Sequence, residues 1–528
     1  MKKKVLWMLA AILTCGLTMT SCFTEDNPVG GDISNGKKLT ILYYGNAGGD
    51  LDDCLLENIR DMYLAGDKSV YDQLNICVQY KNSAKFDIDE KEGKTEETYL
   101  KEIETAVPGF MFEKGNTYRF LLDPAKTYSK EKPQMQFTDD NIYGGKGNKV
   151  NMGDENTLLD FINWAKENYP AENYMLIMND HGGGYMPHDD MPKKASASTR
   201  GIIYDEGYSQ NLTLPGIAKV LKQAGIKFQA IYFDVCLMNN LEYLYELSSV
   251  TDYVMASTYT APGKGGDYKA LYKELATNSN FVKAIENYYD VVGKRWIDID
   301  NPDSPFYADN TLTETADLIK AAPAIKAFVD QLCDSYVNGT ESLIERVDDV
   351  TGTVFKVNDR YPYYDFMDYL SRIYLDETIE KEDEKLSTAA FEAYRAVGSA
   401  VRAQAASYYT DMVAKYRPGY SVLLAQEGSY HVLTIDKDDE GEAQISNYSA
   451  YNWDGTVQDY EKDGSKFEKD GDAYEWGSTG AATYEQLQFD ILTGWSRWLK
   501  LNTEFPNSDS VVGSEWDDSY VAPNNFIE

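Results

Sequence analysis

The sequence predicts an α/β protein: a mostly parallel central sheet with helices on both faces, and an additional α+β region towards the C-terminus. Short apolar runs alternate with amphipathic helical patterns through the first half of the chain, which is typical of strands joined by crossover helices. Most runs are apolar at successive positions instead of every second one, as strands buried on both faces are. Beyond about residue 275 long helical patterns replace this alternation.

Composition narrows the classes of protein to consider. A chain of 528 residues can bury a large core and is expected to hold two or three domains. Its net charge of -36 argues against nucleic acid as a partner, because that binding needs a basic surface. The cysteines show no close pair and no Cys-x-x-Cys spacing, which indicates neither a zinc knot nor a dense disulfide framework. Any mechanism that uses imidazole must use His181, His188 or His431.

Residues 1–22 have the pattern of a secretory signal. A basic start precedes an apolar stretch that is too short for a comfortable transmembrane helix. Cys22 follows the small residue Ser21, which resembles a bacterial lipobox, where the cysteine becomes the lipidated first residue. Residues 23–37 then form a flexible tether. We expect a lipoprotein of the cell envelope at the outer membrane, surface-exposed or released. An ordinary signal peptide with an incidental cysteine is the alternative.

The elements of the first half follow from local signals. Strands are expected at residues 39–44, 74–80, 117–122, 201–204 and 253–257, and in the two runs that lead to His181 and Cys236. Helices are expected at residues 51–64, 157–168 and 214–224, and up to residue 247 from a cap at 239 or 240. Asp154 or Asn156 can cap the second helix, and Gly225 ends the third. Residues 87–98 are charged and expected to be exposed.

The second half is expected to be a supporting region. Long helices are expected at residues 313–336 and 388–416, a strand at 420–425, and a polar acidic stretch at 436–480. A last helix at residues 484–501 carries a stripe with two tryptophans, for which core packing is favoured over sugar stacking.

Two of the apolar runs each end in a reactive side chain. The run from Tyr174 leads to His181 and three glycines, and the run from Phe228 leads to Cys236. In open α/β sheets, sites form in the crevice beyond the carboxyl ends of the parallel strands. If these two strands are neighbours in one sheet, the imidazole and the thiol meet there as a Cys-His pair for covalent catalysis.

Catalysis by a Cys-His pair needs further groups, and the segments around His181 and Cys236 provide them. A thiol attacks a carbonyl as the thiolate, and an imidazole can accept its proton and later protonate the departing amine. Backbone N–H groups of Gly182 or Gly183 and of Cys236 are the expected donors to the oxyanion. Asp234 shares a strand face with Cys236 and can receive a cationic side chain. Two alternatives remain open: a cysteine that merely packs in the core, and a metal site from His181, His188 and Cys236.

Several motifs resemble one known family. The stretch Asn173–Tyr185, with its His-Gly-Gly-Gly-Tyr, resembles the histidine motif of the clostripain family of cysteine endopeptidases, and Phe233–Met238 resembles its cysteine motif. Weaker matches extend the resemblance over most of the mature chain. The family shares the caspase–gingipain type of α/β fold. The resemblance therefore implies a caspase-like sandwich as catalytic domain at residues 38–275 and an α+β supporting region at residues 276–528.

The resemblance also implies roles for individual residues. It implies His181 as the base, Cys236 as the nucleophile, and cleavage of protein or peptide substrates after Arg or Lys. Asp234 matches a residue of the pocket for the basic side chain, and Asp267 is the candidate for a second pocket acid. Two common tryptophans of the family are replaced, by Asn179 and by Gly266.

Relatives are often self-processed shortly after the histidine, and Lys193, Lys194 and Arg200 offer basic residues there. No cofactor is expected to be required. Some relatives use Ca2+, for which this acidic chain shows no recognisable site. The resulting prediction is a lipid-anchored, self-activating cysteine endopeptidase that uses Cys236 and His181. The alternative is a non-catalytic surface lipoprotein that uses the same fold to bind peptide or glycan.

Overall fold

The structure is a computed structural model, and most of the chain beyond the leader is described by it. The described residues are 36–64, 68–87, 94–122, 139–184, 202–258, 261–299, 308–354, 363–406, 421–423, 429–437, 443–452, 457–458, 461–462, 465–466 and 487–501. The leader with Cys22, almost all of the tether, and the processing candidates Lys193, Lys194 and Arg200 lie outside these residues. Their assigned roles stay predictions.

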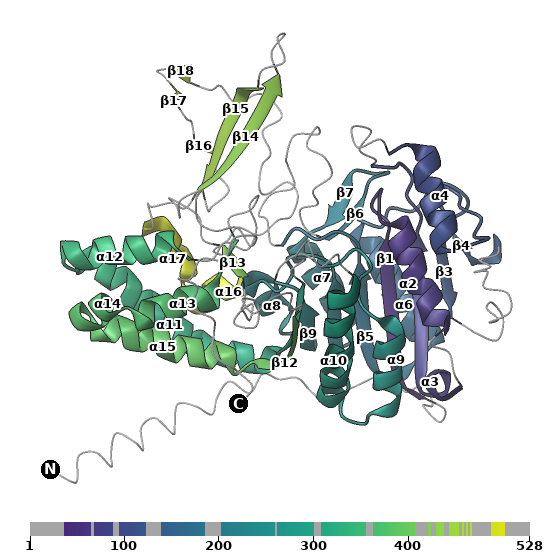
Figure 1. The fold of residues 1–528 in the computed structure, drawn as a ribbon, viewed down its shortest axis with the longest axis horizontal. Helices are drawn as coiled ribbons and strands as arrows, with labels where there is room; N and C mark the ends of the chain where they lie inside the picture. Colours follow the sequence, from purple (N-terminus) through teal and green to yellow (C-terminus); the bar gives the residue numbers. More distant parts are fainter. Residues whose placement is uncertain are drawn as a thin grey trace. The chain divides into compact units, whose positions relative to one another are not determined.

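A nine-stranded sheet forms the centre of the fold (Figure 1). In spatial order its strands are β12 (Val401–Ala406), β10 (Asp309–Glu314), β9 (Thr251–Ala256), β8 (Phe228–Asp234), β5 (Ala171–Asn179), β1 (Lys37–Asn46), β2 (Leu74–Lys81), β3 (Thr117–Leu121) and β4 (Ile142–Tyr143). The strands from β9 to β2 run parallel, and the strands at both edges are antiparallel. The predicted mostly parallel sheet is therefore confirmed.

The sheet separates two hydrophobic cores, because successive side chains of a strand point to opposite faces. In β1, Ile41 and Tyr43 pack into one core, while Leu42 and Tyr44 pack into the other. The first core is covered by α2 (Asp52–Leu64), α3 (Lys68–Gln73), α4 (Glu96–Ala106), α9 (Tyr268–Thr277) and α10 (Phe281–Ile299). The second is covered by α6 (Glu155–Asn168), α7 (Leu214–Ala224), α8 (Leu241–Leu247) and α11 (Thr315–Asn338). Helices on both faces are thus confirmed.

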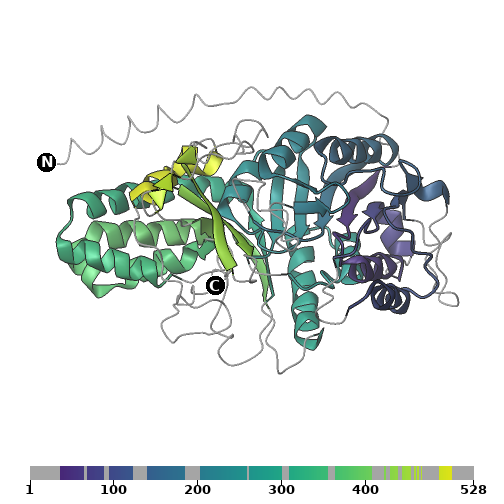
Figure 2. The same cartoon turned by 90° about the horizontal axis from the view of Figure 1, so that it is seen from above.

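Further helices extend the second core (Figure 2). They are α12 (Glu341–Gly352), α13 (Phe366–Leu375), α14 (Glu377–Glu382), α15 (Glu384–Gly398), α16 (Gln488–Thr493) and α17 (Trp495–Leu501). Trp495 and Trp498 are fully buried in it, as the core-packing interpretation of the tryptophan stripe predicts. None of the helices in the described part of the chain is long and apolar enough to span a membrane.

Small strands complete the described elements. They are β6 (Ile202–Asp205) with β7 (Gln210–Leu212), β11 (Tyr363–Asp365) with β13 (Ser421–Leu423), β14 (Ser429–Lys437) with β15 (Ala443–Asn452) and β16 (Val457–Gln458), β17 (Glu461–Lys462) with β18 (Ser465–Lys466), and the 3-10 turn η2 (Asp139–Asn141).

Two helix predictions are wrong in part. The helix expected at residues 388–416 ends at Gly398, and Val401–Ala406 instead form the edge strand β12, whose alternate small side chains are buried. Pairing with β10 overrides the helix propensity of this alanine-rich run. The helix expected at 484–501 is divided by Gly494, whose left-handed φ of 71° ends α16 before α17 begins.

Sequence analysis also missed several elements. The charged segment 87–98 is exposed where it is described, at Asp87 and residues 94–98, as expected, but the start of α4 at Glu96, behind a capping box at Thr95, was not predicted. The helices α9, α10, α12, α13 and α14 and the strand β10 were not expected either. The sheet takes β10 and β12 from beyond residue 275, where the predicted catalytic domain ends, and that boundary stays a prediction.

A buried ion pair fastens β6 to the sheet. The ammonium of Lys81, at the end of β2, lies 2.6 Å from a carboxylate oxygen of Asp205, at the end of β6, and both side chains are fully buried. The same ammonium donates to the carbonyl oxygen of Val150 at 2.8 Å. Asp205 also accepts the backbone N–H of Met152 at 2.8 Å. Both charges are therefore compensated, which a buried ion pair requires.

Replacing Lys81 by Met should leave Asp205 as an uncompensated buried carboxylate. We expect the free energy of unfolding, measured by urea titration, to fall by about 3–5 kcal/mol. Lys68→Met is the matched control, because it breaks the pair of Lys68 with Asp72, whose side chains are 87% and 55% exposed. It should change stability little. Equal losses in the two variants would contradict this role of the buried pair.

Candidate active site

The strand order creates a switch point between β1 and β5. From β1 the chain continues to β2 on one side, whereas from β5 it continues to β8 and β9 on the other. The loops after β1 and β5 therefore leave the sheet in opposite directions at their carboxyl ends. Binding sites of open α/β sheets form at such points. A site is therefore expected in the segments that follow β1, β5 and the neighbouring β8.

The register of β5 and β8 brings the two predicted reactive residues to the same level. Asn179 pairs with Asp234 at the end of the parallel ladder, so His181 and Cys236 each follow two residues later. Contact continues beyond the ladder, because a Cβ atom on Gly182 would lie 2.3 Å from the carbonyl oxygen of Cys236. Only glycine fits there. The expectation that these strands are neighbours is confirmed; the catalytic roles of the two residues stay predictions.

His181 is held by acidic groups. Its Nε2 lies 2.7 Å from Oδ1 of Asp50, which follows β1, and its side chain is 31% exposed. Its backbone N–H donates to Oδ1 of Asp180 at 2.6 Å. Burial disfavours the charged ring, but the hydrogen bond and charge of Asp50, with Asp180 and Asp87, outweigh it and raise the pKa of His181 to about 9. The ring is therefore mostly protonated at neutral pH.

Cys236 is partly buried and contacts the loop after β9. Its Sγ accepts the backbone N–H of Ala261 at 3.2 Å. Burial raises the pKa of the thiol to about 11, partly offset by this N–H, while the charge of Asp234 raises it further. The next residue, Leu237, is buried with a φ of 64°, a costly conformation for a branched side chain. The chain thus turns sharply directly after the thiol.

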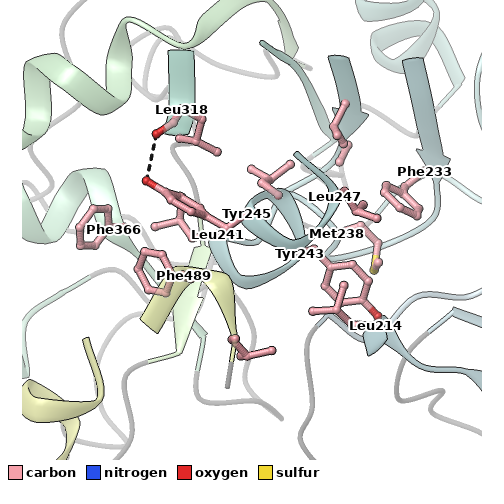
Figure 3. Packing of buried hydrophobic residues seen from close by; sticks show 14 of the residues in the cluster. Leu214, Phe233, Met238, Leu241, Tyr243, Tyr245, Leu247, Leu318, Phe366 and Phe489 are labelled. Carbon is pink, nitrogen blue, oxygen red and sulfur yellow. Dashed lines mark hydrogen bonds between the residues drawn. The ribbon is translucent and has the colours of Figure 1, made fainter. Parts of the chain in front are cut away.

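Packed apolar side chains lie behind this turn (Figure 3). Met238 and Leu241 point into the same apolar cluster as Phe233 of β8 and Tyr243 of α8. Tyr245, on the same helix, donates its hydroxyl to the carbonyl oxygen of Leu318 at 3.0 Å. The segment that carries Cys236 is therefore anchored on both sides, to β8 and through α8 to α11, which suits a group that must be positioned closely.

Asp234 is a buried acceptor of several hydrogen bonds. Only 6% of the residue is exposed, and its Oδ2 accepts the Tyr268 hydroxyl at 2.6 Å and the amides of Asn179 and Gly266 at 3.0 Å each. A Cβ atom on Gly265, whose φ is 57°, would lie 2.4 Å from that oxygen. Asp234 thus fixes the loop before α9 against the end of β8. Both replaced tryptophan positions, Asn179 and Gly266, contact it directly.

The remaining predicted residues have identifiable local roles. Asp267 is half-buried and caps α9, where its Oδ1 accepts the backbone N–H of Ala270 at 2.9 Å. Gly182 forms a β-bridge with Ile202 of β6, and Gly183, which follows it, is buried. The pocket role of Asp267 and the oxyanion roles of Gly182 and Gly183 stay predictions. Within the described residues, no group of three or more His, Cys, Asp or Glu side chains is arranged to hold a metal ion.

Sequence analysis missed Asp50 and Ala261. Asp50 follows two glycines at the end of the first predicted strand. The same rule that singled out His181 and Cys236, a polar residue beyond the carboxyl end of a buried strand, also applies to it. Ala261 lies between β9 and α9, and nothing in its side chain marks its N–H as a partner of the thiol.

A thiol and an imidazole that follow neighbouring parallel strands are groups that an α/β cysteine peptidase can use. The sequence model of the clostripain family matches residues 50–470, so the chain belongs to the clostripain family of cysteine peptidases. The sheet with helices on both faces agrees with the caspase-like fold class that membership implies.

The individual relatives have low sequence identity to this chain. Clostripain of Hathewaya histolytica is 26% identical over 252 residues, which are 45% of this chain and 42% of that relative. The chain thus spans less than half the length of this curated relative. A solved secreted C11 cysteine protease from Bacteroides thetaiotaomicron, in complex with an irreversible peptide inhibitor, is 15% identical with a TM-score of 0.47, covering 87% of this chain and 99% of that one. An inactive zymogen C11 protease from Parabacteroides distasonis is 16% identical with a TM-score of 0.46, covering 74% and 92%.

The pKa values predict how Cys236 reacts with iodoacetamide. Because the pKa of its thiol is raised to about 11, the alkylation rate should keep rising from about pH 6 to about pH 10 instead of levelling off near a free thiol's pKa of about 8.5. The rate is measured by mass spectrometry of the Cys236 peptide in the full chain. Cys77, fully buried in β2, is the control and should stay unlabelled in the native protein. A rate that is already constant at neutral pH would contradict this geometry of the thiol.

Proposed function

We propose that the protein is a secreted, lipid-anchored cysteine endopeptidase that cleaves after Arg or Lys, with Cys236 as nucleophile and His181 as acid–base. The observation that carries the proposal is the register of β5 and β8, which delivers both residues to one edge of the sheet. Family membership supports the peptidase chemistry. The residue roles and the Arg/Lys preference come from the resemblance of the two motifs.

The proposed mechanism has two stages. The neutral His181 ring takes the proton of the Cys236 thiol, the thiolate attacks the scissile carbonyl, and the ring gives that proton to the departing amine, which leaves an acyl-enzyme and a neutral ring. A water molecule then attacks the thioester while the ring takes up its proton, and the ring returns this proton to the Cys236 sulfur as the acid product leaves. Because the pKa of His181 is raised to about 9, the neutral ring that accepts the thiol proton becomes the main form only above that pH. Backbone N–H groups of Gly182, Gly183 and Cys236 are the proposed oxyanion donors.

Substrate preference is proposed to rest on acidic groups beside the thiol. Asp234 precedes Cys236 by two residues, and its carboxylate is held by hydroxyl and amide donors from several elements. Such a fixed negative charge suits a cationic side chain of the substrate. Asp267, at the start of α9, is the proposed second acid. Calcium is not assigned a role, although dependence on it stays open to experiment.

Anchoring and activation are proposed from the sequence. Cys22 is the proposed lipidation site, which would tether the protein to the outer membrane. Cleavage after Lys193, Lys194 or Arg200 is proposed to activate the enzyme. The order of the chain supports this, because β6 begins at Ile202, and its bridge to Gly182 and the ion pair of Asp205 with Lys81 retain the downstream segment after a cut.

Peptide hydrolysis tests the proposed activity. Fluorogenic peptides ending in Arg or Lys should be turned over by the wild type, and one ending in Asp should not. Cys236→Ala should lower kcat/KM by about 10³-fold or more, because it removes the nucleophile. Cys54→Ala is the matched control, since this thiol lies on α2 and should not affect turnover. Equal activity in Cys236→Ala, or turnover of the Asp peptide alone, would overturn the proposal.

Self-processing is a separate prediction. Purified wild-type chain should convert into two fragments on incubation, whereas Cys236→Ala should remain intact. The triple variant Lys193→Ala/Lys194→Ala/Arg200→Ala should slow conversion by about 10-fold or more, because the preferred basic residues are gone. Mass spectrometry of the fragments locates the cut. Conversion of Cys236→Ala at the wild-type rate would show that another protease makes the cut.

The second candidate is a non-catalytic lipoprotein that binds peptide or glycan. What favours it is that each reactive group has another hydrogen-bond partner, Asp50 for the ring and the N–H of Ala261 for the thiol. A chain that binds basic peptides but turns none over, before and after processing, would establish this alternative.

A further inference from the structure

We propose that Asp50 is a positioning residue for His181 and completes a Cys-His-Asp arrangement at the switch point of the sheet. The inference rests on the proposed function, because it assigns a helper to the proposed acid–base. It comes from three observations: the hydrogen bond between the two side chains, the way the loop after β1 is held, and the charges that surround the ring.

The hydrogen bond fixes the ring and its proton. Oδ1 of Asp50 lies 2.7 Å from Nε2 of His181. An ionised carboxylate can only accept, so the proton of the ring stays on Nε2 when the ring is neutral. The lone pair is then on Nδ1, the nitrogen that Asp50 does not occupy, and this is the nitrogen left for the thiol. Asp50 thereby selects the tautomer and the ring orientation that a base for Cys236 needs.

The loop that carries Asp50 is tightly built. Gly48 has a φ of 58°, and a Cβ atom there would lie 2.5 Å from Asp180 Oδ1 and 3.2 Å from Cδ2 of the His181 ring. Gly49 has a φ of 108°, and its N–H donates to the hydroxyl of Ser83 at 3.0 Å. Both glycines adopt the left-handed backbone that other residues avoid. The loop can therefore approach the ring closely only with these two glycines.

The residues on either side anchor this loop to the sheet. The carbonyl oxygen of Gly49 accepts the N–H of Asp87 at 3.0 Å. Asp52, two residues after Asp50, is fully buried and accepts the hydroxyls of Tyr80 and Tyr99 and the N–H of Ser83 at 3.0–3.2 Å. A carboxylate on a fixed loop holds its partner with less loss of conformational entropy than one on a mobile loop does.

The charges around the ring make Asp50 its main ionic partner. The groups that face it are Asp50 after β1, Asp180 beside it, Asp87 after β2 and, behind Asp180, Glu206 after β6. Asp180 is buried, and burial raises its pKa to about 8. Asp50 is 44% exposed and remains hydrated. Its hydrogen bond is the largest influence that raises the pKa of His181.

Three substitutions of Asp50 distinguish its effect on the orientation of the His181 ring from the effect of its charge. Asp50→Asn keeps an oxygen that accepts from Nε2 but removes the charge, Asp50→Ala removes both, and Asp50→Glu keeps the charge on a longer side chain. We expect kcat with an Arg peptide to fall about 10-fold in Asp50→Asn and about 100-fold in Asp50→Ala, with KM changed less than about 3-fold. Asp50→Glu should recover part of the loss.

The pH profile is the readout that a merely structural role would not change. Because the neutral ring is the base for Cys236, kcat/KM should rise with pH as His181 loses its proton, with a limb near pH 9. Asp50→Asn removes the charge that favours the protonated ring and should therefore move this acidic limb to lower pH. NMR titration of the His181 ring compares the same two variants without turnover when both also carry Cys236→Ala. The signal of the ring is the one that disappears in His181→Gln. The pKa of His181 should lie near 9 with Asp50 present and fall towards the ordinary value of about 6.5 in the Asp50→Asn variant.

Asp87→Asn is the matched control. Asp87 is exposed and raises the pKa of His181 by its charge, and it donates its backbone N–H to the loop after β1. This variant should lower kcat several-fold less than Asp50→Asn does. Equal losses in the two variants, or an unchanged acidic limb and ring pKa in Asp50→Asn, would overturn the inference. If Asp50→Ala does not fold, the Asn and Glu variants and the NMR titration decide. Failure of the proposed function is distinct, because Cys236→Ala would then retain full activity.

Discussion

In a parallel pair of strands, each residue advances the two chains by the same distance. Asn179 opposite Asp234 therefore puts His181 level with Cys236, although 55 positions separate each pair in the chain. Gly182 shows that the ends remain in contact, because its missing side chain leaves room for the backbone of Cys236. The chemistry proposed for this chain depends on that register. A shift of one residue in either strand would turn the side chains of that strand to the opposite face.

The edge of the sheet that holds these residues is strongly acidic, and burial changes what its carboxyl groups do. Burial raises the pKa of Asp52 to about 6, of Glu206 to about 7 and of Asp180 to about 8. These groups act mainly as hydrogen-bonded supports for loops. The exposed Asp50 instead lies 2.7 Å from the imidazole of His181. Exposure therefore distinguishes Asp50, which holds the imidazole, from the buried carboxyl groups, which hold the backbone.

The sequence was sufficient to predict a structural feature where that feature requires a recognisable local pattern of residues. Strands buried on both faces must be apolar at every position, so the central strands, and His181 and Cys236 at their ends, could be predicted. β12 could not, because its alanines favour a helix until β10 pairs with them. Asp50 looks like the neighbouring aspartates in sequence, and only the strand order brings it to the ring. Asp234 was predicted as a pocket acid, but the donors from Asn179, Gly266 and Tyr268 that surround it come from segments far apart in the chain.

The most direct test of the account measures the proximity of residues 181 and 236. His181→Cys introduces a second thiol beside Cys236, and the variant is treated with a short bifunctional thiol reagent and mapped by mass spectrometry. The register predicts a crosslink between the two peptides, with Cys77, buried in the sheet, left unmodified. Separate modification of the two thiols without any crosslink would contradict the claim that the ends of β5 and β8 form one site.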